Sequence, residues 1–272
     1  MKHYKSKAEA DDAWANAAYV PEAQDIIDSW ETNAAEYREK LLAEGRAQIN
    51  IPYGDGERHG FDVFLPEGTP KGMMVFIHGG YWIRFDRSYW SHFAQGANEN
   101  GWAVAMPSYD LCPTVGIPEI TKQITRAIET IAAQNPDLPL IIAGHSAGGH
   151  LTARMLEPGR FAPEIEQRIT RAVPISPVAD LRPIMETSMN EQFKLDQATA
   201  TAESPIAGQN SLDIPITVWV GNAERPVFIE QATTLSKNWE CDLMLDAGKH
   251  HFDVIDGLKD ANSDLTKTVL GL

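Results

Sequence analysis

An apolar run that ends in a serine between two glycines constrains this chain more than any other feature. Residues 140–151 have the sequence Leu-Ile-Ile-Ala-Gly-His-Ser-Ala-Gly-Gly-His-Leu, so a β-type run passes through Gly-x-Ser-x-Gly into a stretch that permits a helix. This pattern is typical of a nucleophile elbow, in which Gly144 and Gly148 leave room where a Cβ would collide with neighbouring backbone. We therefore predict that Ser146 is a nucleophile at a strand-to-helix turn. The alternative is a glycine-rich turn whose serine is merely hydrogen-bonded.

Composition restricts the class of protein and its partners. The chain has 272 residues, 43% of them hydrophobic and 22% charged, as is typical of a globular protein with room for one large α/β domain. The net charge of -15 argues against nucleic acid and membrane surfaces as partners, because binding to either relies on basic patches. Cys112 and Cys241 support neither a disulfide framework nor a cysteine-rich metal site.

The first residues and the hydropathy of the chain predict its location. The amino terminus lacks the apolar segment of a secretory signal, and no run approaches the ~20 apolar residues of a membrane-spanning helix. Together with the low cysteine content, this predicts a cytoplasmic protein that acts on a small-molecule substrate.

Strand-like and helix-like patterns alternate along the sequence. The pattern predicts strands at residues 47–52, 60–66, 73–78, 102–106, 139–143, 172–175, 216–220 and 241–245. An Asp-Gly step at Asp55 and Gly56, in the turn 53–56, is a cue for a hairpin between the first two strands. Isoleucines recur at helical spacing from Ile120 to Ile131, after Pro118. This alternation predicts a mostly parallel sheet with helices on both faces, that is, one α/β domain over residues 1–272.

Two segments are predicted as additions to that domain. Residues 1–46 are expected to form a helical amino-terminal extension, because residues 11–45 are rich in Ala, Glu and Asp and end at Gly45. Residues 180–213 are polar and weakly periodic, and we interpret them as an insertion that caps the carboxyl edge of the sheet. Ligands bind at that edge in open α/β sheets.

A serine nucleophile needs a base, and the base needs a third group that holds its tautomer. His250 and His251 follow the last predicted strand, where the base falls in the chain order serine, acid, histidine. We favour His251, because Phe252 and Val254 would anchor the turn that holds it. A metal site or a surface doublet is the alternative for this pair. The other histidines lie in less suitable contexts: His3, His59 and His92 as surface or packing residues, His78 in a loop, and His145 and His150 beside the nucleophile.

The third group, an acid that holds the histidine, is predicted to follow the strand 216–220. Glu224 lies in the loop after that strand, where its carboxylate would accept a hydrogen bond from His251. Asp246 and Asp253 are closer to the histidine in sequence and remain alternatives, although solvated loop carboxylates are the better interpretation of both.

Residues 78–82, His-Gly-Gly-Tyr-Trp, follow an apolar strand and have the form of an oxyanion loop. Gly79 and Gly80 would let the backbone approach a substrate, and the N–H of Ala147 would complete the oxyanion hole. Tyr81 and Trp82 are predicted to wall a pocket for a flat substrate, with packing aromatics as the alternative. We place His145 in the same pocket.

These residues resemble the α/β-hydrolase superfamily, and more closely its kynurenine formamidase (arylformamidase) branch. The resemblance rests on local patterns at residues 51–56, 62–66, 78–82, 108–113, 144–148 and 251–255, which follow one another in the family's order. It implies hydrolysis of N-formylkynurenine to kynurenine and formate by a serine triad, with no metal and no cofactor, and it is compatible with a homodimer.

The sequence departs from the family pattern at two positions. Glu224 stands where the family usually has aspartate, and Gly149 stands where alanine is more usual. Related hydrolases cleave small carboxylic esters. The predicted function is therefore cleavage of an aryl formamide or a small ester. The alternatives are a general short-chain carboxylesterase and a non-catalytic binding protein on the same scaffold.

Overall fold

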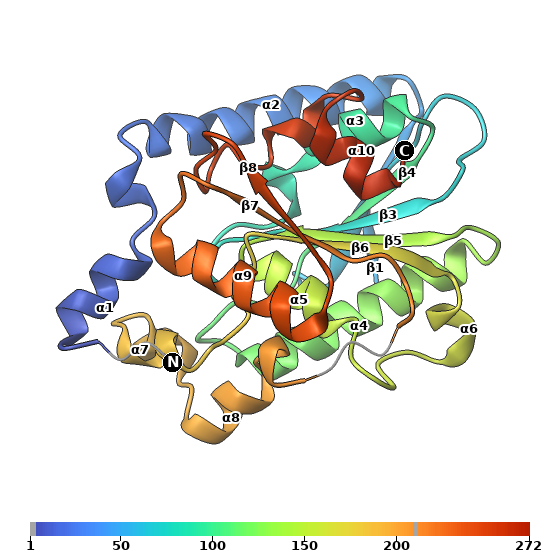
Figure 1. Ribbon diagram of the computed structural model, residues 1–272. Coiled ribbons are helices and arrows are strands. Elements are labelled where there is room, and N and C mark those ends of the chain that lie inside the picture. Colours follow the sequence, from blue (N-terminus) through green and yellow to red (C-terminus); the bar gives the residue numbers. More distant parts are fainter. Residues whose placement is uncertain (1–3, 209–211) are drawn as a thin grey trace.

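One eight-stranded sheet divides the part of the chain that the computed structural model describes, residues 4–208 and 212–272, into two helical layers (Figure 1). The strand order is β1-β2-β4-β3-β5-β6-β7-β8. β2 runs antiparallel to β1 and β4, and the remaining pairs are parallel. The predicted fold class, a mostly parallel sheet with helices on both faces, is confirmed. The strands are β1 (Ala47–Pro52), β2 (Gly60–Phe64), β3 (Met73–Ile77), β4 (Ala103–Pro107), β5 (Leu140–His145), β6 (Ile169–Ile175), β7 (Thr217–Gly221) and β8 (Asp242–Asp246).

The continuous apolar runs arise because both faces of the sheet are covered. In β3, Met73, Val75 and Ile77 belong to the core on one face, whereas Met74 and Phe76 belong to the core on the other. A strand that is buried on both faces needs apolar side chains at every position rather than at alternate positions. The absence of alternation in the sequence therefore places this strand in the middle of the sheet.

Each helical layer packs its apolar stripe on one face of the sheet. In Figure 1, α2, α3 and α10 lie above the sheet and α4, α5 and α9 lie below it. The predicted helix with isoleucines at helical spacing is α4, and Pro118 lies in its first turn. The α-helices are α1 (Lys7–Trp14), α2 (Ala23–Ala43), α3 (Gln95–Glu99), α4 (Ile117–Gln134), α5 (Ala147–Arg154), α6 (Pro163–Glu166), α7 (Asn190–Phe193), α8 (Gln197–Ala202), α9 (Pro226–Trp239) and α10 (Asp264–Leu270). No described helix is long and apolar enough to cross a bilayer.

The two predicted additions meet each other beside the sheet. Within residues 1–46, α1 and α2 are separated by a non-α-helical stretch at residues 15–22, and residues 180–213 contain α7 and α8. Ser188 donates its backbone N–H to an Asp11 carboxylate oxygen at 2.6 Å, and α1 and α7 are close together in Figure 1. Residues 1–3, with His3, and residues 209–211, inside the predicted insertion, lie outside the described residues.

The β1–β2 hairpin forms as predicted, but its loop is longer than the expected turn. Residues 53–59 connect the two strands, and His59 at the end of this loop takes part in closing it. The backbone N–H of Gly56 donates to His59 Nδ1 at 3.1 Å, and His59 Nε2 lies 3.0 Å from an Asp110 carboxylate oxygen. Contacts of His59 with a distant segment therefore set the loop length, rather than the Asp-Gly step.

Three histidines, His78, His92 and His150, lie buried in the packed layers, and burial is the main cause of their low pKa values. Burial lowers the pKa of His78 to about 4 and that of His92 and His150 to about 3. In His92 neither ring nitrogen has a hydrogen-bond partner among the described residues. In the folded protein these three imidazoles therefore stay neutral at pH values between 4 and 6.5, where the same histidines are protonated in the unfolded chain.

We expect the free energy of unfolding to fall as the pH is lowered from 6.5 towards 4. In that window the histidines are protonated in the unfolded state and stay neutral in the folded state. Each such histidine lowers the free energy of unfolding by about 1.4 kcal/mol per pH unit. Urea unfolding at a series of pH values measures this slope. The variant His92→Leu should have a slope that is smaller by about one proton. An identical slope in the variant would contradict the assignment.

Candidate active site

Ser146 lies at the sharp turn between β5 and α5, as predicted for an elbow. Its φ is 58° and its ψ is -114°, a conformation that is strained for a residue with a Cβ. The turn fits because its neighbours lack side chains. A Cβ at Gly144 would lie 2.5 Å from the carbonyl oxygen of Gly148, and a Cβ at Gly148 would overlap the carbonyl oxygen of Ile77. Helix α5 therefore packs closely against β3, and the serine is held at the strand end.

A buried series of hydrogen bonds joins three segments that are distant in the sequence. His251 Nε2 lies 3.0 Å from Ser146 Oγ, and His251 Nδ1 lies 2.6 Å from Glu224 Oε2. All three side chains are buried. When Nδ1 carries the proton and donates it to the carboxylate, Nε2 is left as an acceptor for the serine hydroxyl. The arrangement can thus remove a proton from Ser146 while it stabilises the charge that develops on the imidazole.

The Glu224 carboxylate has two further donors. Its Oε1 accepts a hydrogen bond from the backbone N–H of Gly221 at 2.9 Å and another from Ser176 Oγ at 2.5 Å. Sequence reasoning missed Ser176. Its signal is positional: Ser176 follows β6 directly, and the carboxyl end of β6 lies next to that of β7, which precedes Glu224. These donors fix the carboxylate and compensate for its burial.

The two alternative acids serve other groups. Asp246 accepts a hydrogen bond from Trp219 Nε1 at 3.2 Å, and Asp253 accepts one from the backbone N–H of His250 at 2.7 Å. His250 Nδ1 in turn accepts hydrogen bonds from the backbone N–H groups of the next turn. The structure therefore brings Glu224, and neither aspartate, to the His251 ring. Among the described residues, no group of three or more His, Cys, Asp or Glu side chains is placed to hold a metal ion.

The glycines of the predicted oxyanion loop lie against the nucleophile. A Cβ at Gly79 would lie 3.1 Å from Ser146 Cβ, so only a glycine lets the two segments approach this closely. Gly80 has a φ of 111°, and the next two residues, Tyr81 and Trp82, have φ values of 52° and 58°. Three successive left-handed residues curl this loop tightly. Ala147 begins α5, where backbone N–H groups have no partner within the helix.

A cavity of about 360 Å³ opens over Ser146 and His251, and its wall is largely aromatic. The predicted residues Gly80, Tyr81 and His145 line it. Sequence reasoning did not single out the other residues of the wall, which come from several segments: Asp11, Trp14, Ala15, Asn16, Ala17, Ala18, Ile27, Trp30, Arg84, Phe85, Trp90, Met189 and Phe252. The amino-terminal extension therefore forms much of this wall.

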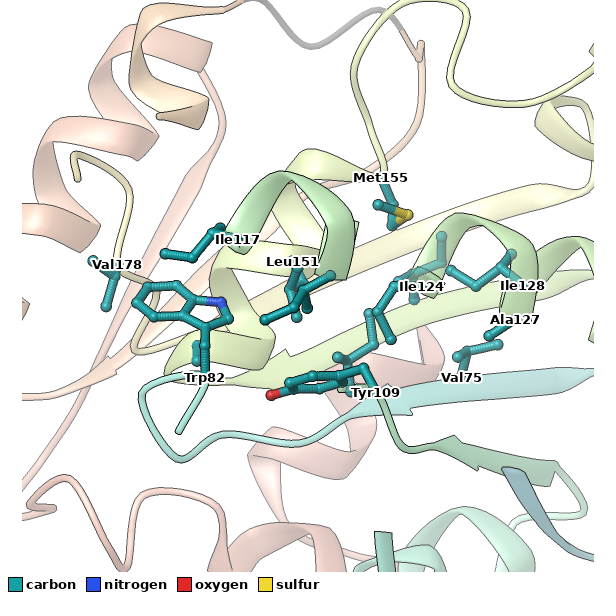
Figure 2. Close-up of a cluster of buried hydrophobic side chains, with 14 of the residues drawn as sticks. Val75, Trp82, Tyr109, Ile117, Ile124, Ala127, Ile128, Leu151, Met155 and Val178 are labelled. Carbon is teal, nitrogen blue, oxygen red and sulfur yellow. The ribbon is translucent and has the colours of Figure 1, made fainter. Parts of the chain in front are cut away.

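Trp82 does not wall this cavity, which corrects one prediction. Its side chain is fully buried and packs edge-on against the rings of His150 and Phe193, with ring centroids 5.0 and 5.6 Å apart. Figure 2 shows the indole near Ile117 and Val178, in the core between the sheet and helices α4 and α5. Neighbouring side chains of the curled loop take opposite sides, so Tyr81 reaches the cavity and Trp82 anchors the loop in the core.

His145 contributes a neutral ring to the cavity. Burial, and next the nearby His251, hold the pKa of His145 well below its usual range. The centroids of the two imidazole rings lie 4.7 Å apart. Protonation of both rings at once would bring two buried positive charges together, so a proton removed from Ser146 would go to His251, whose Nε2 lies 3.0 Å from Ser146 Oγ.

Comparisons with known proteins agree with this geometry. A family model described as the alpha/beta hydrolase fold matches residues 74–248. The chain is 28% identical to kynurenine formamidase of Salmo salar and 27% identical to that of Danio rerio, over 91% of this chain and 89% of each relative. Among solved structures, a putative thioesterase from Silicibacter sp. is 53% identical with a TM-score of 0.93, over 96% of this chain and 99% of that chain. Thermogutta terrifontis esterase 2 has the same fold, with 19% identity and a TM-score of 0.65 over 83% of this chain and 92% of that chain.

We expect Gly148→Ala to destabilise the protein strongly. The new Cβ has no space beside the Ile77 carbonyl, so α5 must move away from β3, at a cost of about 3 kcal/mol in the free energy of unfolding. Thermal or urea unfolding measures the loss. Gly208→Ala is the matched control, because the nearest atoms to its Cβ lie 3.6 and 3.7 Å away. Equal stability of the two variants would contradict the close packing at the elbow.

We expect Ser176→Ala to slow the reaction of Ser146 with a fluorophosphonate probe about tenfold, because Glu224 loses a charge-assisted hydrogen bond of about 1.5 kcal/mol. The labelling rate at saturating and subsaturating probe is the measurement. Ser29→Ala is the control, since the Ser29 hydroxyl bonds only a carbonyl of its own helix. Equal rates for wild type and Ser176→Ala would show that this hydroxyl does not support the acid.

Proposed function

The chain belongs to the family of the α/β hydrolase fold and is a hydrolase, and we propose that it cleaves an aryl formamide through Ser146, His251 and Glu224. One observation carries the proposal. The buried hydrogen bonds of 3.0 and 2.6 Å that link the three side chains end at a serine that faces an aromatic cavity. A hydroxyl, an imidazole and a carboxylate in this order are the machinery of acyl transfer.

In the proposed mechanism, Ser146 Oγ attacks the formyl carbon while His251 Nε2 takes the hydroxyl proton. The positive charge on the imidazole is stabilised by Glu224, which accepts the Nδ1 hydrogen bond. The carbonyl oxygen becomes an oxyanion, and the backbone at Gly79, Gly80 and Ala147 supplies the hole for it. A preorganised hole of this kind lowers the barrier by several kcal/mol relative to water.

The second half of the mechanism releases both products. The C–N bond breaks, and His251 returns its proton to the aniline nitrogen, which leaves as a neutral amine. A formyl ester on Ser146 remains. Water then attacks the ester while His251 takes one of its protons, formate departs, and the proton returns to Ser146. The cycle balances with water as the only co-substrate.

The cavity supports an aryl leaving group. Trp14, Trp30, Tyr81, Phe85 and Trp90 line it, and flat rings of this kind pack well on an aromatic substrate. Two fish proteins that share about 90% of their length with this chain are named kynurenine formamidase, which acts on a formamide of an aromatic amine. Both observations favour an aryl formamide such as N-formylkynurenine.

A second candidate is a short-chain ester or thioester hydrolase. The Silicibacter relative, which is 53% identical over 96% of this chain, is described as a putative thioesterase. The same serine, base and acid would attack an ester carbonyl, and a better leaving group than an aniline would make that step easier. The non-catalytic alternative fits poorly, because the three side chains are hydrogen-bonded in the productive order.

A substrate panel tests the proposal. We expect kcat/KM for N-formylkynurenine to exceed that for p-nitrophenyl acetate, p-nitrophenyl butyrate and a short acyl thioester, because its side chain and its aromatic ring together fill more of the cavity than a p-nitrophenyl group or an aliphatic thioester does. Product formation is followed by absorbance.

Ser146→Ala should lower turnover by about 10⁴-fold or more, because the nucleophile is lost.

The outcomes of the panel separate the candidates. Rapid turnover of the ester or thioester with no formamide cleavage would assign the second candidate. Near-normal activity of Ser146→Ala would reject the mechanism for every substrate. Ser29→Ala is the control for handling and folding, since Ser29 lies on the exposed side of α2.

A further inference from the structure

Arg84 and Asp11 are the charged side chains in the described wall of the cavity, and they differ in how they are engaged. Asp11 accepts two hydrogen bonds of 2.6 Å from Ser188, one from the backbone N–H and one from the hydroxyl. Arg84 lies over the Phe85 ring at 4.9 Å, and no hydrogen bond or ion pair joins its guanidinium to another described residue. The cation of the cavity is therefore free to bind a ligand.

The stacked position of Arg84 suits it to an anion. Contact with the Phe85 ring covers the face of the guanidinium and leaves the N–H donors at its edge available. Those donors form a fork that matches the two oxygens of a carboxylate. Arginines elsewhere in the same region are already used: Arg58 donates to Tyr109 O, and Arg87 pairs with Asp62.

The position of Arg84 couples it to the reacting centre. Its backbone N–H donates to the carbonyl oxygen of Gly80 at 3.0 Å, so the guanidinium extends from the same curled loop as the proposed oxyanion glycines. Arg84 and Ser146 also line one cavity. A substrate with its carbonyl at Ser146 and its ring against the aromatic wall can direct an anionic group to Arg84 at the exposed rim.

Arg84 is a positive charge at the cavity of a strongly acidic protein. With a net charge of -15, the protein as a whole repels anions. The unpaired Arg84 at the cavity supplies a positive charge to which an anionic group of a ligand can bind.

We propose that Arg84 binds a carboxylate of the substrate and gives the enzyme a preference for aryl formamides that carry a free carboxylate. The proposal rests on the proposed function and deepens it, because it names the part of the substrate that is recognised. The effect belongs to substrate binding and early capture, so it acts chiefly on KM rather than on kcat.

The test compares two formamides with the same reacting group in wild type and Arg84→Ala. N-formylkynurenine carries the carboxylate, and 2′-formamidoacetophenone has the same ring and formamide without it. The measured quantity is the ratio of their kcat/KM values. We expect Arg84→Ala to lower this ratio about tenfold to a hundredfold, as the loss of a charged hydrogen bond does. Arg84→Lys should fall in between, because it keeps the charge and loses the fork.

Arg126→Ala is the matched control, because it removes one exposed arginine far from the cavity wall, where Arg126 pairs with Glu119 on α4. It should keep the wild-type ratio. A ratio that drops equally in Arg126→Ala and Arg84→Ala would reflect the overall charge and overturn the proposal. Cleavage of both formamides with an unchanged ratio in Arg84→Ala would overturn it while the proposed function stands.

A binding measurement makes the proposal independent of turnover. Trp14, Trp30 and Trp90 line the cavity, so tryptophan fluorescence reports the binding of kynurenine and of 2′-aminoacetophenone, which lacks the carboxylate. We expect wild type to bind kynurenine more tightly and Arg84→Ala to lose that preference. If neither formamide is cleaved and this loss still occurs, the proposed function fails and the role of Arg84 stands. Equal binding of both ligands by wild type would overturn the role of Arg84.

Discussion

The buried carboxylate of Glu224 is the constraint on which the site depends. A carboxylate removed from water is costly unless hydrogen bonds replace its solvation. Here Ser176, the backbone of Gly221 and the His251 ring provide them, at 2.5 to 2.9 Å. These donors come from the carboxyl ends of β6 and β7 and from the loop after β8, so the order of the parallel strands brings them together. The sheet topology thus brings together the donors that allow the Glu224 carboxylate to be buried.

The amino-terminal segment completes the site from outside the sheet. Tyr81 donates its hydroxyl hydrogen to the carbonyl oxygen of Trp14 at 2.7 Å, and the Asn16 amide donates to the Tyr81 hydroxyl at 3.3 Å. Arg225, the neighbour of Glu224, donates to the carbonyl oxygen of Asp12 at 3.0 Å. Residues 12–16, from the last turn of α1 into the stretch that follows it, are therefore bonded both to the predicted oxyanion loop and to the loop of Glu224. The amino-terminal extension forms much of the cavity wall and restrains the two loops on which the proposed chemistry depends.

Local patterns in the sequence predicted the features that local forces determine. The apolar runs identified the strands, and the glycines around Ser146 identified the elbow, because both depend on near neighbours in the chain. The order of the elements led to Glu224 and to the pair His250 and His251, and the apolar residues that follow favoured His251 over His250. Ser176 and the opposite directions of Tyr81 and Trp82 could not be predicted, because strand order and loop curvature set them. The aromatic cavity was missed for the same reason, since its wall joins segments more than 100 residues apart.

The loop that contains Gly80 combines several structural roles within residues 79–84. Its glycines allow close approach to Ser146, Trp82 fixes it in the core, Tyr81 bonds the amino-terminal segment, and Arg84 presents a free cation at the cavity. Because three successive residues are left-handed, the loop is stable only while those anchors hold. The proposed recognition of a remote anion and the proposed stabilisation of the reacting carbonyl therefore depend on the same short stretch of backbone.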